Sequence, residues 1–195
     1  MVLQLHKRLM ALAGVVMTAY LIFHMLSNLS FFSESAFNSF YDIYNAGPIR
    51  WLVLLLMAAA IAIHVKAAIK IRKVNAKART IDYAKHDKFK IPAFLVTISI
   101  IFLLSFIVIH IVQSLFFDTS MLYDEVTALF KSAFMVLFYL AGLFVLTMHL
   151  SHSLANVLQT LGKTSVIYQS LVWTGVLSLT GGFASIPLYI YFVMP

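Results

Sequence analysis

The chain has 195 residues, of which 62% are hydrophobic, and carries a formal net charge of +7. A composition this apolar, with a mean hydropathy of +0.95, excludes a water-soluble globular protein and predicts an all-α integral membrane protein. The absence of cysteine excludes disulfides, iron–sulfur clusters held by this chain and the covalent attachment of c-type haem.

Five apolar stretches, each near the roughly 20 residues that a bilayer requires, are predicted to be transmembrane helices. In chain order they run approximately over residues 9–32, 51–71, 91–117, 132–161 and 168–194. We expect them to form a single transmembrane domain over residues 1–195. Between the first two spans, Ser35–Asn45 places aromatic side chains on one helical face, which predicts a short helix at the membrane interface.

Basic residues are concentrated between the second and third spans. Nine of the fourteen lysines and arginines lie between Lys66 and Lys90. Lys7 and Arg8 fall on the same side of the membrane if the spans alternate in direction, whereas the opposite side is mostly acidic. Because positive charge marks the cytoplasmic side, we expect the N-terminus in the cytoplasm and the C-terminus outside.

Four of the five spans each carry one histidine well inside the membrane, namely His24, His64, His110 and His149. An ionisable side chain within a membrane is costly and usually functional. At about 1.5 Å per residue, His24 and His110 lie roughly 12–15 Å from the outer polar residues, and His64 and His149 roughly 21–27 Å from them. The matched depths predict two bis-imidazole sites for two haem b groups. His24 and His110 would bind the outer haem, and His64 and His149 the inner haem.

The surroundings of these histidines lead to further expectations. A ligating imidazole needs a hydrogen-bond partner at its second nitrogen, and because no carboxylate lies inside a span, we expect backbone carbonyls in that role. Small residues such as Gly142 are expected to let a flat macrocycle approach the helices. His152, one turn beyond His149, is the alternative ligand of the inner haem; otherwise it is expected at the membrane interface.

Several short motifs follow one another along the chain. They are His24 within Leu21–Leu26, Pro48–Arg50 before the second span, His64 sixteen residues after that proline, His110 in the third span, and Tyr139, Gly142 and His149 in the fourth. Their order and spacing resemble the single-chain, five-helix dihaem cytochrome b anchor of succinate:quinone oxidoreductases and fumarate reductases. In that family the first and third helices share one haem and the second and fourth share the other, which is also the pairing that depth predicts.

The resemblance implies a complex in the bacterial cytoplasmic membrane. A flavoprotein subunit would carry the dicarboxylate site, and an iron–sulfur subunit would relay electrons, both on the cytoplasmic side. The basic segment Lys66–Lys90 is the expected docking surface for them, with attraction to anionic membrane lipid as its alternative role. Nucleic acid is not among the implied partners.

Quinone is the implied electron acceptor or donor, and we expect it near the outer face. Glu34 and Asp42 flank the interfacial segment and are candidates for proton exchange with quinone, which requires a titratable group within reach. The alternative is that Glu34 and Asp42 are solvated loop carboxylates with no part in quinone chemistry. Ser27, Asn28 and Trp51 are further candidate neighbours of the quinone.

The expected mechanism is electron transfer from the iron–sulfur partner to the inner haem, then to the outer haem and to quinone. The direction of catalysis stays open. Two other functions are compatible with the sequence: a dihaem cytochrome serving a hydrogenase or another dehydrogenase, and a haem-free transporter or assembly factor whose histidines relay protons.

Overall fold

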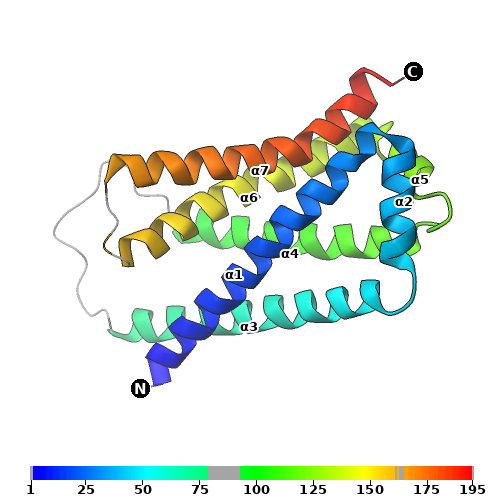
Figure 1. The fold of residues 1–195 in the computed structure, drawn as a ribbon. Helices are drawn as coiled ribbons and strands as arrows, with labels where there is room; N and C mark the ends of the chain where they lie inside the picture. The colour runs from blue at the N-terminus through cyan, green and yellow to red at the C-terminus, as the bar shows by residue number, and fades with distance from the viewer. Residues whose placement is uncertain (1, 79–92, 161, 163–164, 195) are drawn as a thin grey trace. The chain divides into compact units, whose positions relative to one another are not determined.

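The computed structural model describes residues 2–78, 93–160, 162 and 165–194, and these residues are helical with short connections and no strands (Figure 1). Five of the helices in this part of the chain are long and apolar enough to cross a membrane, as expected. They are α1 (Val2–Leu29), α3 (Ile49–Ala78), α4 (Ala93–Phe116), α6 (Ala133–Thr160) and α7 (Val166–Phe192). The multi-pass helical class predicted from hydropathy is therefore confirmed.

Three short elements connect the long helices. The 3-10 helix η1 (Ser30–Phe32) and helix α2 (Glu34–Asn45) follow α1, and α5 (Leu122–Phe130) precedes α6. Helix α2 confirms the helix predicted over Ser35–Asn45. Helix α5 was not predicted, although Asp124 and Glu125 lie in its first turn, where carboxylates interact favourably with the helix dipole.

The chain divides into two compact units. Unit 1 comprises Met1–Phe23 and Ala46–Ile91, so it contains most of α1 and all of α3. Unit 2 comprises His24–Asn45 and Pro92–Pro195, so it contains the end of α1, η1, α2 and helices α4 to α7. The single domain expected over residues 1–195 stays a prediction.

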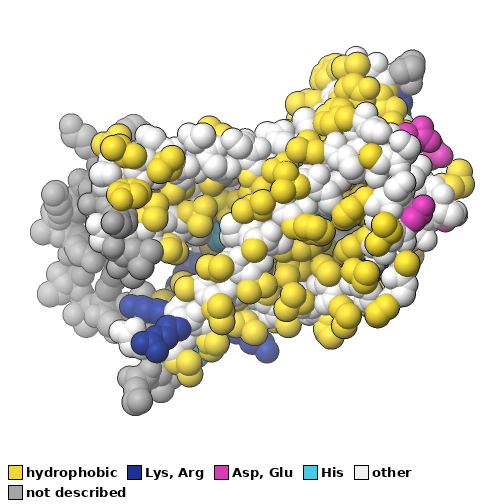
Figure 2. Space-filling view, in the orientation of Figure 1, with side chains coloured by type: hydrophobic (Ala, Val, Ile, Leu, Met, Phe, Trp, Pro, Cys, Tyr) yellow, Lys and Arg dark blue, Asp and Glu magenta, His cyan; other side chains and the backbone are white. Residues whose placement is uncertain are grey.

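Unit 1 carries a stripe of positive charge. Figure 2 shows Lys and Arg side chains gathered near the start of α1. On α3, an exposed lysine recurs every three or four residues, at the spacing that places side chains on one helical face. These lysines are Lys66, Lys70, Lys73 and Lys77. The side of the membrane that they occupy stays a prediction.

Unit 2 is held together by the packing of α6 along α7 and of α4 against α6 (Figure 1). Thr147 on α6 and Thr180 on α7 approach within 3.1 Å through their hydroxyl oxygens, and each hydroxyl also bonds to a carbonyl of its own helix. Small hydroxylated residues at such a contact let transmembrane helices approach closely. At one end of the unit, Phe31 is 1% exposed and stacks on Tyr123 of α5 with ring centroids 4.5 Å apart.

The contact between α4 and α6 is tightest at Gly142. A Cβ atom added there would lie 2.5 Å from the ring of Phe106 on α4. Gly142 was expected to make room for a macrocycle, but in the structure an aromatic ring fills the space beside it. The physical reason is that a helix without a Cβ atom at this position lets the flat Phe106 ring pack directly on its backbone.

Substituting Gly142→Ala therefore tests this packing. The added methyl group collides with a rigid ring, and overpacking of this kind typically costs about 1–3 kcal/mol. We expect a lower midpoint of thermal unfolding for the detergent-solubilised protein, followed by circular dichroism. The matched control is Gly175→Ala on α7, where a Cβ atom would meet nothing within 4 Å. Equal midpoints for the two variants would contradict the packing described here.

Candidate bis-imidazole site

His24 and His110 lie side by side in unit 2. His24 belongs to the end of α1 and His110 to the second half of α4, and both side chains are partly buried. Their ring centroids are 5.8 Å apart, with the ring planes inclined at 57°. The structure thus brings together the two histidines that depth assigned to the outer site.

Hydrogen bonds determine which nitrogen of His110 carries the proton. The Tyr139 hydroxyl, on α6, donates to Gln113 Oε1 at 2.8 Å. The same hydroxyl oxygen lies 3.2 Å from His110 Nδ1. Because the single hydroxyl proton is directed to Gln113, His110 Nδ1–H donates to the tyrosine oxygen. A neutral His110 therefore keeps its lone pair on Nε2.

A second set of contacts indicates that the lone pair of His24 is also on Nε2. Tyr41 of α2 donates to Asn28 Oδ1 at 2.5 Å, so the amide nitrogen of Asn28 is the atom that approaches His24. Asn28 Nδ2 lies 3.4 Å from His24 Nε2, which is long for a hydrogen bond. Since an amide nitrogen donates, His24 Nε2 holds a lone pair. The Nε2 atom of His24 is thus the acceptor in this long contact with Asn28.

Aromatic rings surround the two imidazoles. Phe106 stacks over His110 with centroids 6.3 Å apart and planes inclined at 16°. Phe183 of α7 lies against His24, with centroids 5.5 Å apart. The polar contacts of the site are thus embedded in apolar side chains, where the dielectric is low and a bonded polar group is held firmly.

The separation of the two imidazoles is close to that of two rings that share one metal. Two imidazoles that share one metal at about 2.0–2.1 Å per nitrogen have ring centroids about 6 Å apart, which the observed 5.8 Å matches. Among the residues that the structure describes, no group of three or more His, Cys, Asp or Glu side chains could hold a metal ion. A haem supplies four nitrogen donors to its iron, so the protein supplies only the remaining ligands.

His64 of unit 1 has the tautomer required of a ligand. Its Nδ1 lies 3.1 Å from the carbonyl oxygen of Met10 on α1. A carbonyl only accepts, so Nδ1 donates and the lone pair of neutral His64 lies on Nε2. The backbone carbonyl expected as imidazole partner is therefore confirmed for His64. The same expectation is wrong for His110, whose partner is the Tyr139 hydroxyl, because α6 carries that tyrosine within reach of the ring.

Gly14 is a neighbour of His64 that sequence reasoning did not identify. A Cβ atom at Gly14 would lie 3.7 Å from His64 Cε1, so the imidazole packs closely against this part of α1. A glycine in the middle of an apolar span is a signal of such close approach.

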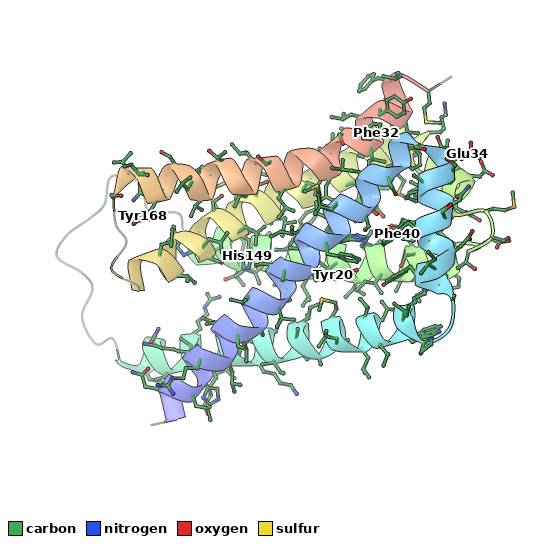
Figure 3. All side chains as sticks on the ribbon, viewed as in Figure 1. Tyr20, Phe32, Glu34, Phe40, His149 and Tyr168 are labelled. Atoms are coloured by element: carbon green, nitrogen blue, oxygen red, sulfur yellow. The ribbon has the colours of Figure 1, made fainter. Side chains whose placement is uncertain are left out.

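The inner pair is divided between the units. His64 belongs to unit 1. His149, labelled in Figure 3, is partly buried on α6 of unit 2, so the pairing of the two histidines stays a prediction. His152 is exposed, and its Nε2 lies 2.9 Å from Asn156 Nδ2 one turn away. This arrangement favours the interfacial role for His152 over that of a ligand.

The candidate quinone residues lie on or near α2. Glu34 and Asp42 are both exposed, and Glu34 occupies the first turn of α2, where it also interacts favourably with the helix dipole (Figure 3). Ser27 is buried and donates to the carbonyl oxygen of His24 at 2.9 Å. Through Asn28, Tyr41 links α2 to His24, a role that its place in the aromatic face of the predicted helix did not reveal.

Burial raises the pKa of Tyr41 from 10.0 to about 12, the hydrogen bond with Ser27 opposing this and the nearby Tyr44 adding to it. Because the phenolate is disfavoured in the folded state, the folded protein loses stability relative to the unfolded chain as pH rises from 10 through 12. We expect an ultraviolet tyrosinate titration of the native protein minus that of Tyr41→Phe to show one group ionising near pH 12. Ionisation of this group near pH 10 in the folded protein would contradict its burial.

No family model matches this chain, and no curated protein or solved structure is similar enough to count as a match. The geometry of the histidines and the resemblance of the motifs are therefore the basis for any assignment of function.

Proposed function

We propose that this chain is a dihaem b-type cytochrome that anchors a succinate dehydrogenase or fumarate reductase complex in the membrane. In this role it passes electrons between an iron–sulfur subunit and quinone. The observation that carries the proposal is the pair of imidazoles of His24 and His110, 5.8 Å apart within apolar surroundings, each with a lone pair on Nε2.

The residues of the chain have separate tasks in this proposal. His24 and His110 would hold one haem iron, and His64 and His149 would hold the second. A bound haem supplies one-electron redox chemistry at its iron. Tyr139 and the Met10 carbonyl fix the tautomers of His110 and His64, so that Nε2 is the nitrogen offered to the metal. Phe106 and Phe183 keep water away from the outer pair.

Docking of the partner subunits is assigned to the basic segment Lys66–Lys90, of which the lysine stripe of α3 is described and residues 79–90 lie outside the described residues. Lys66, Lys70, Lys73 and Lys77 are exposed, and α3 continues as a helix to Ala78, about two turns beyond the stripe's second lysine. A rigid basic helix suits an acidic protein surface, and the same charge attracts anionic lipid. The flavoprotein and iron–sulfur subunits of the resembling family are the proposed occupants.

Quinone chemistry is assigned to the end of unit 2 that carries α2. Glu34 and Asp42 are exposed carboxylates there and are able to exchange protons with bulk water. Tyr41 and Asn28 connect α2 to His24 by hydrogen bonds, which places a polar path beside an otherwise apolar site.

The pigment content of single variants tests the haem sites. Purified from a haem-replete host, the chain is expected to bind about two b-type haems, measured by pyridine haemochrome and a reduced-minus-oxidised spectrum. His24→Ala and His110→Ala should each lose one haem, and the same one, because both residues ligate it. His64→Ala should lose the other. The control His152→Ala should retain both, and a colourless wild-type protein would refute the proposal.

Electron transfer toward an outer quinone predicts sensitivity to membrane potential. None of the five spans contains Asp or Glu, so no carboxylate inside them carries a compensating proton. Moving one elementary charge across the membrane against the potential costs about 2.3 kcal/mol of free energy per 100 mV. We expect turnover of the complex in sealed vesicles to generate a potential, read with a voltage-sensitive dye, and to accelerate when an ionophore dissipates it. Turnover indifferent to the ionophore would contradict charge separation.

A further inference from the structure

We infer that Tyr139 is a positioning residue that lowers the reduction potential of the haem held by His24 and His110. The inference rests on the proposed function, because it concerns the electronic properties of a ligand to iron. It assigns to Tyr139 a task that neither the depth of the histidines nor the motif resemblance suggests.

A chain of hydrogen bonds links α4 and α6 at this point. Gln113 Nε2 donates to Met135 Sδ at 3.6 Å, which directs Gln113 Oε1 toward the Tyr139 hydroxyl. The hydroxyl donates to Gln113 Oε1 at 2.8 Å, and its oxygen accepts from His110 Nδ1–H at 3.2 Å. The hydroxyl has a single proton, which Gln113 accepts, so its oxygen is the acceptor toward His110.

Packing prevents Tyr139 from moving away from this position. The tyrosine is 9% exposed, and its ring is edge-on to Phe130 at 4.8 Å and to Phe106 at 5.4 Å. Its ring also meets the His110 ring at 5.7 Å with the planes inclined at 80°. Because these contacts involve the ring and not the hydroxyl, phenylalanine at this position keeps the packing and removes only the hydroxyl, which accepts from His110 and donates to Gln113.

The electronic consequence follows from the direction of the bonds. An acceptor at Nδ1–H draws the proton away from the imidazole and makes Nε2 a more basic ligand. A more basic axial ligand stabilises ferric iron relative to ferrous iron. Gln113 strengthens the effect, since accepting the tyrosine proton makes the tyrosine oxygen a better acceptor.

Potentiometric titration of the haem in Tyr139→Phe tests the inference. The couple is the one-electron reduction of ferric to ferrous iron by the mediator, and no bond in either residue breaks. We expect the preference for ferric iron to fall about tenfold, which is a rise in midpoint potential of about 59 mV for one electron. Working in a His64→Ala background leaves one haem to titrate, and the shift is measured against that parent.

The matched control is Tyr123→Phe, in the same unit, whose ring stacks on Phe31. It should leave the potential unchanged. If Tyr139→Phe retains haem with an unshifted or lowered potential, the inference is wrong while the proposed function stands. If the parent protein binds no haem at all, the proposed function fails first.

If Tyr139→Phe loses its haem, the midpoint potential of the Gln113→Leu variant tests the inference instead. This variant keeps Tyr139 and removes the acceptor that orients the tyrosine proton, together with the contact of Gln113 Nε2 with Met135 Sδ. A rise in midpoint potential of less than about 59 mV, which is a less than tenfold loss of the preference for ferric iron, supports the inference. A potential identical to that of the parent overturns it.

Discussion

The candidate site in unit 2 depends on the placement of two imidazole rings, those of His24 and His110, among apolar side chains. A buried polar group inside a membrane costs several kcal/mol unless it is hydrogen-bonded, so both rings need partners that fix them. The protein fixes both rings through their neighbours. Tyr139 accepts from one imidazole and Asn28 approaches the other. In the proposed function, these two fixed rings would hold the iron of one haem.

The contact between α4 and α6 serves the fold and the site together. Phe106 lies one turn before His110, and Gly142 lies three residues after Tyr139. When the Phe106 ring packs on Gly142, the two helices are brought to the separation at which His110 reaches the Tyr139 hydroxyl. The same ring stacks on His110. One aromatic side chain therefore links helix packing, imidazole orientation and the hydrogen bond at the second nitrogen.

Hydropathy was sufficient to predict the five long helices, because a bilayer imposes both their length and their apolar composition. Counting residues along the spans was sufficient to place His24 near His110, since depth depends only on the rise of a helix. The roles of Tyr139, Gln113 and Gly14 were not predicted, because these roles depend on how each helix is rotated about its axis, which a uniformly apolar span does not encode. Helix α5 was missed because its acidic first turn resembles a loop. The pairing of His64 with His149 stays a prediction, since the two residues belong to different units.

Electron paramagnetic resonance of the oxidised protein tests most directly whether His24 and His110 are the two axial ligands of one haem. Two strong nitrogen ligands give low-spin ferric iron, whereas loss of one axial ligand gives high-spin iron. The account predicts low-spin signals in the wild-type protein. His24→Ala and His110→Ala should abolish the same low-spin signal or convert it to high spin, and leave the second signal unchanged. Low-spin signals that survive intact in both variants would contradict the account.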